Sequence, residues 1–328
     1  MGEALEVAKV LVNPTIKLLD MVGGAIGTLY EPKHKRKMAD ATAYEIEVIG
    51  DAMRKAADLP IVYDQNGVAI NSEDFARLMQ RAGTRWALQE TIKQHNIESV
   101  VDNAYDILEK GEYCSEDPVD SDWINSFFDS IANVSNEQMQ IIWGRILAGE
   151  IKTPGCFSIR TLDTLRKMTQ KEAMLFKKYA PYILQCMGNK EKTFYDYFLL
   201  DNMLGEFQEM VFPEILILHE AGLISLNGIS ITLFIEPNST EYISGLSYDI
   251  EFKNTGDTNV AVSEEAFVLT ESGKELYNVI LSIGVEMPSE EYYDKCLEII
   301  SSKSFLDDKK WKSQVETKIV DRQALIVT

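Results

Sequence analysis

The chain has 328 residues, enough for two or three domains that each bury a core. Its 32 basic and 52 acidic residues give a formal net charge of −20 at pH 7, which repels polyphosphate and disfavours nucleic acid as a partner. Four cysteines without metal-ligand spacing and three scattered histidines indicate reduced thiols, no metal site and no cofactor. The sequence shows neither a basic secretory signal near its start nor an apolar run of membrane-spanning length, so we predict a cytoplasmic protein.

The first predicted region, residues 1–110, opens with a glycine-containing apolar segment at 5–30. An apolar helix that ends in basic residues is typical of a segment lying on an anionic membrane surface. A helix buried in a bundle, with its basic end solvated, explains the same pattern. Both interpretations stay open, and the first would place the protein at the inner membrane surface. The basic cluster consists of Lys33, Lys35, Arg36 and Lys37.

A helical apolar stripe occupies 38–57, and a long helix is predicted over 73–110. Arg77, Arg81 and Arg85 recur in the long helix at a spacing of four residues. Like charges at this spacing destabilise an isolated helix by about 0.2–0.5 kcal/mol per pair, so acidic groups should face them. Those acids can come from the preceding helix or from a second copy of the chain. Binding of phosphate or lipid is a third interpretation.

A short acidic linker is predicted at 111–122, followed by a central helical domain at 123–190. A Pro-Gly pair breaks the helical pattern of this domain once. Thr169 is followed three residues later by Glu172, the pattern of a capping box that opens a helix. The helices before it are expected at 123–132, at 136–150 and from 158 onward. Ser135 is a good N-cap for the second of these helices, or Asn133 if that helix starts earlier.

The pattern changes again at 191–284, which we predict to be a small α+β module similar to a winged helix. The sequence FPEILILHEA at 212–221 indicates an apolar helix that ends at Gly222. Asn227-Gly228 lies between two apolar runs and predicts a β-hairpin. Because FPEILILHEA lacks the basic residues of a DNA-recognition helix, protein contact is favoured over DNA binding.

Residues 285–328 are predicted to form a helix near 288–302 and a tail whose closing stretch, KIVDRQALIVT, is an edge strand. The predicted fold class is therefore mainly α. An N-terminal and central helical bundle is followed by the small winged-helix-like α+β module and the C-terminal helix.

Charged residues flank the Pro-Gly break of the central domain, among residues that are otherwise apolar. The first interpretation is a structural network of ion pairs and packing that fixes the helix geometry. A second is a site for an anion, because Arg side chains match carboxylate and phosphate groups. A serine nucleophile would need an adjacent base, and no histidine is near in sequence. The residues concerned are Arg145, Glu150, Ser158 and Arg160.

Three blocks of sequence carry a resemblance to a known family. They are GTLYEP at 27–32, the run from Arg81 to Glu98, and WGRILAGEIKTPGCFSIRTLDTLRKMTQKEAMLF at 143–176. Together they resemble an uncharacterised bacterial family known as a domain of unknown function, similar in layout to the abortive-infection alpha proteins. The resemblance implies a mostly helical cytosolic protein with a role in antiphage defence. It supplies no established catalytic residue.

We therefore expect a non-enzymatic, oligomerising interaction protein that acts as a defence sensor or effector. Its expected partner is another copy of itself or a different protein, with an anionic membrane surface as a further partner. Two alternatives stay open: a winged-helix transcriptional regulator, and an enzyme with an Arg/Glu/Ser site in the central domain.

Overall fold

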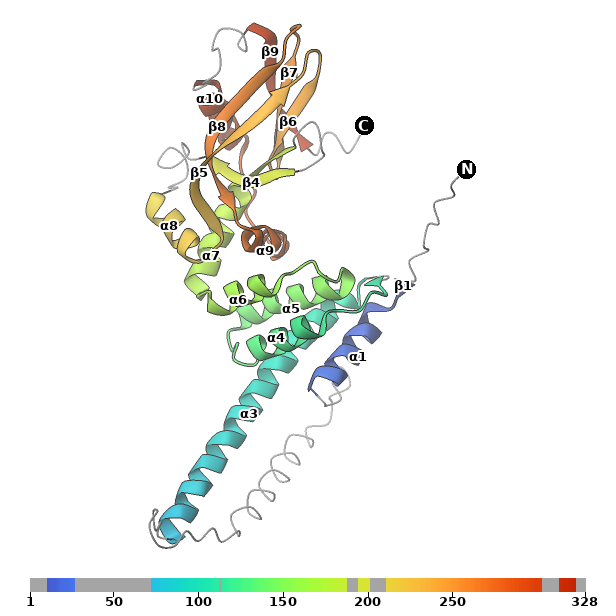
Figure 1. The fold of residues 1–328 in the computed structure, drawn as a ribbon, viewed down its shortest axis with the longest axis vertical. Coiled ribbons are helices and arrows are strands. Elements are labelled where there is room, and N and C mark those ends of the chain that lie inside the picture. The colour runs from blue at the N-terminus through green and yellow to red at the C-terminus, as the bar shows by residue number, and fades with distance from the viewer. Residues whose placement is uncertain are drawn as a thin grey trace. The chain divides into compact units, whose positions relative to one another are not determined.

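The computed structural model describes residues 11–26, 72–111, 114–187, 194–200, 211–302 and 313–322. The chain separates into two compact units, Met1–Phe157 and Ser158–Thr328 (Figure 1). This boundary falls inside 123–190, which we predicted as one central domain. The helices of that range are therefore shared between two hydrophobic cores.

The described part of the first unit is helical except for one short strand pair. Asn13 starts the first helix, because its side-chain oxygen accepts a hydrogen bond from the backbone N–H of Thr15 at 3.0 Å. Pro14 then occupies the first helical position, where its missing N–H costs nothing. The elements are β1 (Leu11–Val12), α1 (Pro14–Ile26), α3 (Ser72–Leu108), β2 (Cys114–Ser115), α4 (Ser121–Ile131) and α5 (Glu137–Lys152).

The caps of α4 and α5 explain where these helices begin. The side chain of Asp120 accepts from Trp123 N at 2.9 Å, and that of Asn136 accepts from Met139 N at 3.1 Å. The sequence suggested Ser135 or Asn133 as the cap of α5, and both suggestions were wrong. Asn is as good a capping residue as Ser, and the side-chain oxygen of Asn136 reaches the N–H of Met139, the third residue of the helix.

Aromatic residues build the core between α4 and α5. The rings of Trp123 and Phe127 stack at 5.0 Å, and Phe127 meets Trp143 edge-on at 5.5 Å. Helix α5 packs closely on α3 at Gly144, where an added Cβ would lie 2.5 Å from the Cβ of Asn103. The glycine therefore sets how closely the two helices approach.

Within 111–122, which we predicted as a linker, the structure places strand β2. This strand pairs antiparallel with β1, and Val119 behind it is buried. The ammonium group of Lys17 donates to the backbone oxygens of Ser115 at 2.9 Å and Asp117 at 2.7 Å. These contacts fasten the acidic stretch to α1.

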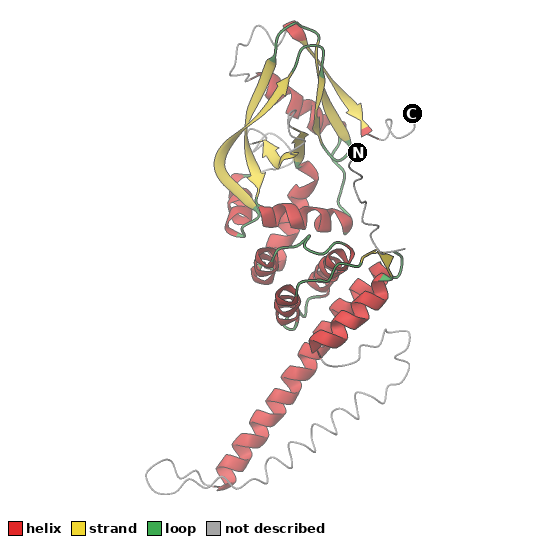
Figure 2. Ribbon diagram, turned by 45° about the vertical axis from the view of Figure 1, so that its right-hand side comes forward, coloured by secondary structure: helices red, strands yellow, loops and turns green. Residues whose placement is uncertain are grey.

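The second unit combines helices with an antiparallel sheet, and Figure 2 shows most strands of the described chain in this unit. The order of the seven described strands in the sheet is β5-β8-β4-β3-β6-β7-β9. Its elements are α6 (Ile159–Lys167), α7 (Gln170–Tyr179), a 3₁₀ turn (Ala180–Tyr182), β3 (Leu184–Met187), β4 (Phe194–Leu200), α8 (Phe212–Glu220), β5 (Ile224–Ile235), β6 (Thr240–Ser244), β7 (Tyr248–Asn254), β8 (Val260–Leu269), α9 (Glu271–Ser282), α10 (Glu290–Ser302) and β9 (Val315–Asp321).

Several local predictions are confirmed in this unit. Thr169 and Glu172 form the capping box of α7, with Glu172 N donating to the Thr169 hydroxyl at 3.3 Å. Gly222 follows α8 with φ of 76°, a left-handed conformation that glycine adopts without strain. Strand β9 is an edge strand of the sheet, as expected for the start of the closing stretch.

The predicted hairpin at Asn227-Gly228 was wrong. These residues lie inside the single strand β5, which pairs with β8 on both sides of them. The register shifts between Ser225 and Ile229, so the irregular dipeptide is absorbed as a bulge rather than a turn. Strand β8 is long enough to pair with the apolar residues on both sides of Asn227-Gly228, so they form one strand.

The coarse fold prediction, a helical first part followed by an α+β part, agrees with the structure. The sheet is larger than the predicted module, because β3 and β9 come from outside 191–284. Helix α10 packs on β7, β8 and β9 and contributes the buried Tyr292 and Tyr293. Gly245 leaves room for Tyr293, whose ring would lie 2.2 Å from an added Cβ.

Candidate functional site

Glu150, near the end of α5, binds the loop that follows its own helix. Its side chain is 1% exposed and accepts hydrogen bonds from Gly155 N at 2.5 Å and Phe157 N at 3.0 Å. A buried carboxylate is tolerated when backbone N–H groups satisfy it. Glu150 therefore holds the Pro-Gly break in shape. Arg145 lies on the same helix and is partly buried.

Ser158 begins α6 in the second unit as its N-cap. Its side chain accepts from Thr161 N at 3.3 Å, and its own N–H donates to the carboxylate of Glu275 at 2.7 Å. The acid thus lies at the positive end of the α6 dipole, where it is stabilising. The hydroxyl of Ser158 also donates to the Glu275 carboxylate at 3.3 Å, so this acid binds both the backbone and the side chain of the capping residue.

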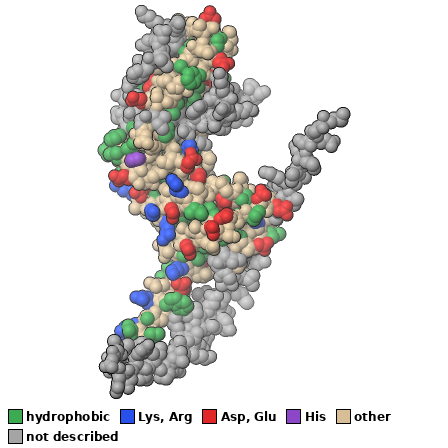
Figure 3. Space-filling view, in the orientation of Figure 1, with side chains coloured by type: hydrophobic (Ala, Val, Ile, Leu, Met, Phe, Trp, Pro, Cys, Tyr) green, Lys and Arg blue, Asp and Glu red, His purple; other side chains and the backbone are tan. Residues whose placement is uncertain are grey.

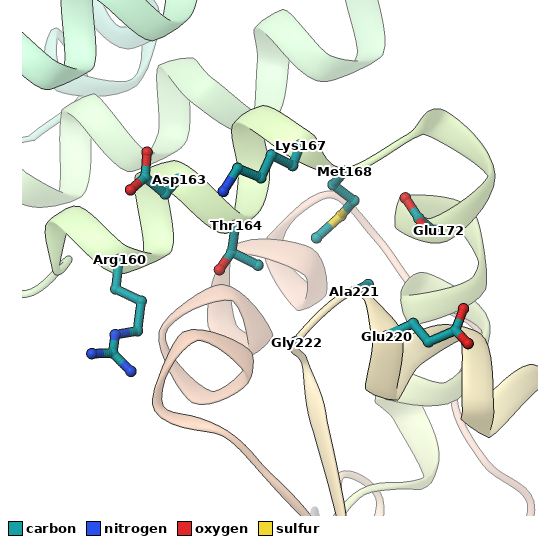
Figure 4. A pocket seen from close by; sticks show the side chains of 9 residues that line it. All are labelled: Arg160, Asp163, Thr164, Lys167, Met168, Glu172, Glu220, Ala221 and Gly222. Atoms are coloured by element: carbon teal, nitrogen blue, oxygen red, sulfur yellow. The ribbon is translucent and has the colours of Figure 1, made fainter.

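Arg160 is exposed on α6 and lines a cavity of about 480 Å³ (Figure 4). One wall is α6, and the other is formed by the start of α7 and the end of α8. Figure 4 shows the side chains spread around the opening rather than converging on one point. The described lining residues are Arg160, Asp163, Thr164, Lys167, Met168, Glu172, Glu220, Ala221 and Gly222.

The chemistry of this cavity is mixed. Cations on α6 face acids on α7 and α8, and the hydroxyl of Thr164 donates to that of Ser272 at 3.5 Å. None of the nine described lining residues is a cysteine or histidine. Three of the four predicted central residues thus have two different roles. Glu150 and Ser158 bind backbone groups, and Arg160 borders a cavity in the second unit.

A different surface stands out on α3. Every side chain resolved from Ala76 to His95 is exposed or half-buried, and burial begins at Asn96. Figure 3 shows blue basic and green hydrophobic side chains mixed along this half of the helix. Four large hydrophobic side chains here are at least half exposed: Leu78 at 50%, Trp86 at 53%, Leu88 at 60% and Ile92 at 57%.

The three predicted arginines belong to this surface. We define the basic–apolar face as one stripe of α3 that repeats at three and four residues. All of its members except Arg77 border a groove of about 510 Å³, whose described lining residues all belong to α3. The arginines were predicted from the sequence, but the apolar residues beside them were missed, although their helical spacing was visible. The basic–apolar face consists of Arg77, Arg81, Arg85, Leu88 and Ile92.

A charged cluster joins α7 to the start of α8. The carboxylate of Glu214 accepts from Lys178 at 2.6 Å and from the Tyr179 hydroxyl at 2.7 Å. Burial of Glu214 favours its neutral form, but these two hydrogen bonds outweigh burial and lower its pKa. Burial and the bond to Glu214 raise the pKa of Tyr179, which stays protonated. These hydrogen bonds therefore link α7 to the start of α8.

Burial suppresses the reactivity of two of the cysteines, Cys186 and Cys296. All four are free thiols. Burial raises the pKa of both Cys186 and Cys296 to about 12, so neither is a thiolate at neutral pH. Across the described ranges, no group of His, Cys, Asp and Glu side chains is arranged to hold a metal ion.

The predicted basic cluster Lys33, Lys35, Arg36 and Lys37 lies outside the described residues. The same holds for residues 38–57, which we considered as partners for the arginines. Of the helices that the structure describes, none is both long and apolar enough to cross a bilayer.

Fold and surfaces together define a two-part protein, with an α-helical unit and an α+β unit, whose most unusual feature is an exposed helix face. A family model described as protein of unknown function (DUF2806) matches residues 80–296. The match spans more than half of the chain, so the chain belongs to this family of proteins of unknown function. No curated protein and no solved structure matches the chain.

Proposed function

We propose that the protein is a non-enzymatic interaction protein that self-associates through the basic–apolar face of α3. The observation that carries this proposal is the exposure of Leu88 and Ile92, at 60% and 57%, beside three arginines. Soluble proteins rarely leave such a mixed patch uncovered unless it serves an interaction. Arginine with large apolar residues is also the composition favoured at protein interfaces.

Charge favours an acidic partner. Residues 76–95 carry four cations and one acid, on a chain whose net charge is −20. The remaining surface of any second copy is therefore strongly negative and attracts this helix half. Within the described chain, Glu116, Asp117, Asp120 and Asp122 are all exposed and offer one such acidic surface. A second copy is thus the partner to which we commit.

We further propose a role as a sensor or effector in antiphage defence, with the protein located in the cytoplasm or at the inner membrane surface. The support is the resemblance to a bacterial family and its likeness in layout to abortive-infection alpha proteins. Four free cysteines are compatible with a reducing compartment.

The winged-helix alternative has one observation in its favour. Helix α8, strands β5 and β8, and helix α9 follow the expected order of a helix, strands and a second helix. Exposed Phe212 and Leu216 on α8 lie near the acidic Glu214 and Glu220. This composition supports contact with protein rather than with DNA phosphates.

The self-association proposal is tested by measuring mass against protein concentration in sedimentation velocity. The double variant Arg81→Glu/Arg85→Glu should shift the protein toward monomer, because it places acids against an acidic partner. The matched control Arg166→Glu/Lys171→Glu makes the same charge change on exposed residues of the second unit and should associate as the unchanged protein does. Equal masses for both variants at every concentration would rule out α3 as the contact.

Defence is tested separately by expressing the chain in a bacterial host and counting phage plaques. The unchanged chain and the Arg166→Glu/Lys171→Glu control should protect, whereas Arg81→Glu/Arg85→Glu should not, at equal soluble expression. Protection by both variants would separate defence from the α3 contact.

A further inference from the structure

One helix of the second unit carries acids that match the arginines of α3. Along α10, Glu290, Asp294 and Glu298 recur at a spacing of four residues, and all three side chains are exposed. We call these three residues the acidic stripe. Arg81 and Arg85 on α3 are exposed at the same spacing. Like charges at this spacing destabilise their own helix, so opposite charges from another helix would stabilise each stripe.

Two acids of the acidic stripe are open to a partner. Glu298 is paired with Lys295 on its own helix at 2.9 Å. Among the described residues, neither Glu290 nor Asp294 forms an ion pair. A single exposed ion pair contributes little to binding, but several matched pairs fix the register and direction of an interface.

We infer that the basic–apolar face of α3 binds the acidic stripe of a second copy, with α3 and α10 antiparallel. Four residues of either helix rise about 6 Å, so Arg85 opposite Glu290 places Arg81 opposite Asp294. The inference rests on the proposed self-association and names the surface that receives α3. Because both stripes are exposed in the single chain, their pairing requires a second copy.

Exposed apolar residues favour the antiparallel direction. Leu88 lies three residues after Arg85 and is 60% exposed, and Met287 lies three residues before Glu290 and is 63% exposed. In the antiparallel register these two side chains meet, and each removes apolar surface of the other from water. A parallel pair with the same number of ion pairs would place Leu88 opposite Ser301 instead.

Other surfaces of a second copy match the arginines less well. The half of α3 from 76 to 95 carries four cations and one acid, so a second α3 would repel it. Glu116, Asp117 and Asp120 precede α4, and Asp120 already caps that helix. Only Asp122 of this group lies within the helix, so the group forms no stripe at helical spacing.

Charge reversal on both sides of the contact tests the inference by sedimentation velocity. The α10 variant, Glu290→Arg/Asp294→Arg, should weaken self-association about tenfold, as should the α3 variant, Arg81→Glu/Arg85→Glu. The chain that carries all four substitutions should regain association, because its ion pairs are reversed rather than broken. If this chain stays monomeric with unchanged circular dichroism and thermal unfolding, the two stripes do not pair and the inference is wrong.

A matched control separates this inference from the proposed function. Glu116→Arg/Asp122→Arg makes the same charge change on exposed acids of the first unit and should associate as the unchanged protein does. If this control is monomeric and the α10 variant associates normally, α3 binds the first unit, and only the inference fails. If the α3 variant associates normally, the proposed contact through α3 fails as well.

The direction of the helices is tested by cross-linking. Leu88→Cys and Met287→Cys are prepared as separate chains and mixed under mild oxidation. A disulfide-linked dimer should form in the mixture, whereas each variant alone should give only the background of the native thiols. Absence of this dimer at a concentration where the unchanged protein associates would contradict the antiparallel register.

Discussion

The two halves of α3 belong to one uninterrupted helix but lie in opposite environments. From Asn96 to Leu108 the helix packs into the first unit, and Val100, Val101, Ala104 and Leu108 are fully buried. From Ala76 to His95 no side chain is buried. Apolar residues recur at helical spacing in both halves, so spacing alone indicates a helix face without showing what covers it. The difference lies in the arginines of the exposed half.

The largest expected effect is a difference in unfolding free energy between a substitution in the buried half of α3 and one in its exposed half. Leu108→Ala should destabilise the protein by about 3 kcal/mol, because it leaves a cavity in a fully packed site. Leu88→Ala should change the unfolding free energy by less than about 0.5 kcal/mol, since the side chain already contacts water. Urea denaturation at a concentration where the protein is monomeric measures both. Equal costs would show that the exposed half is covered within the monomer.

The second comparison concerns two helical glycines, one in close contact with a neighbouring helix and one in open space. Gly144→Ala should cost about 1–3 kcal/mol, because the new methyl group would collide with Asn103 and with backbone atoms of α3. Gly23→Ala in α1 meets nothing within 4 Å and should stabilise the helix by about 0.5–1 kcal/mol. The same denaturation experiment compares them. A neutral Gly144→Ala variant would mean that α5 does not press on the buried half.

The junction between the halves supplies the third test. The side chain of Asn96 is 3% exposed and donates to the backbone oxygen of Ala132 at 2.9 Å. Asn96→Ala should therefore cost about 1–3 kcal/mol, because it leaves that oxygen without its donor. The neighbouring His95→Ala, at an exposed position, should be nearly neutral. Similar losses at both positions would place the boundary of burial elsewhere.

The smallest effects concern charges. The ion pair between Glu90 and Lys93, at 2.7 Å on the exposed half, should contribute under about 0.5 kcal/mol to the unfolding free energy. Glu214 has a lowered pKa, so its contribution is present above the ordinary pKa of glutamate and is lost as pH falls through its lower value in the folded protein. The stability difference between the unchanged protein and Glu214→Gln should therefore shrink on acidification. A stability difference that grows toward low pH would contradict the lowered pKa of Glu214.

Local signals in the sequence predicted helices well, because caps and breaks act over a few residues. Thr169 with Glu172, Gly222 and the apolar run at 212–221 all mark the ends that the structure shows. Long-range pairing was harder to predict. Asn227-Gly228 has the local chemistry of a turn, but its place in β5 depends on β8, which lies more than thirty residues away along the chain.

The candidate surfaces were predicted only in part, for a physical reason. Arg81 and Arg85 were recognised because like charges at helical spacing need a partner, whereas Leu88 and Ile92 were not singled out. Whether an apolar residue is covered depends on elements distant in sequence. Glu150 shows the reverse case: its charge suggested an ion pair, yet its described partners are backbone amides of the next loop.

We expect the basic–apolar face of α3 to dock on a second copy of the chain. Hydrogen exchange measured at low and at high protein concentration tests it most directly. Amides of residues 76–95 should exchange more slowly as the protein concentration rises, whereas those of 96–108 should exchange slowly at every concentration. Exchange in 76–95 that does not depend on concentration would show that this face does not dock on a second copy.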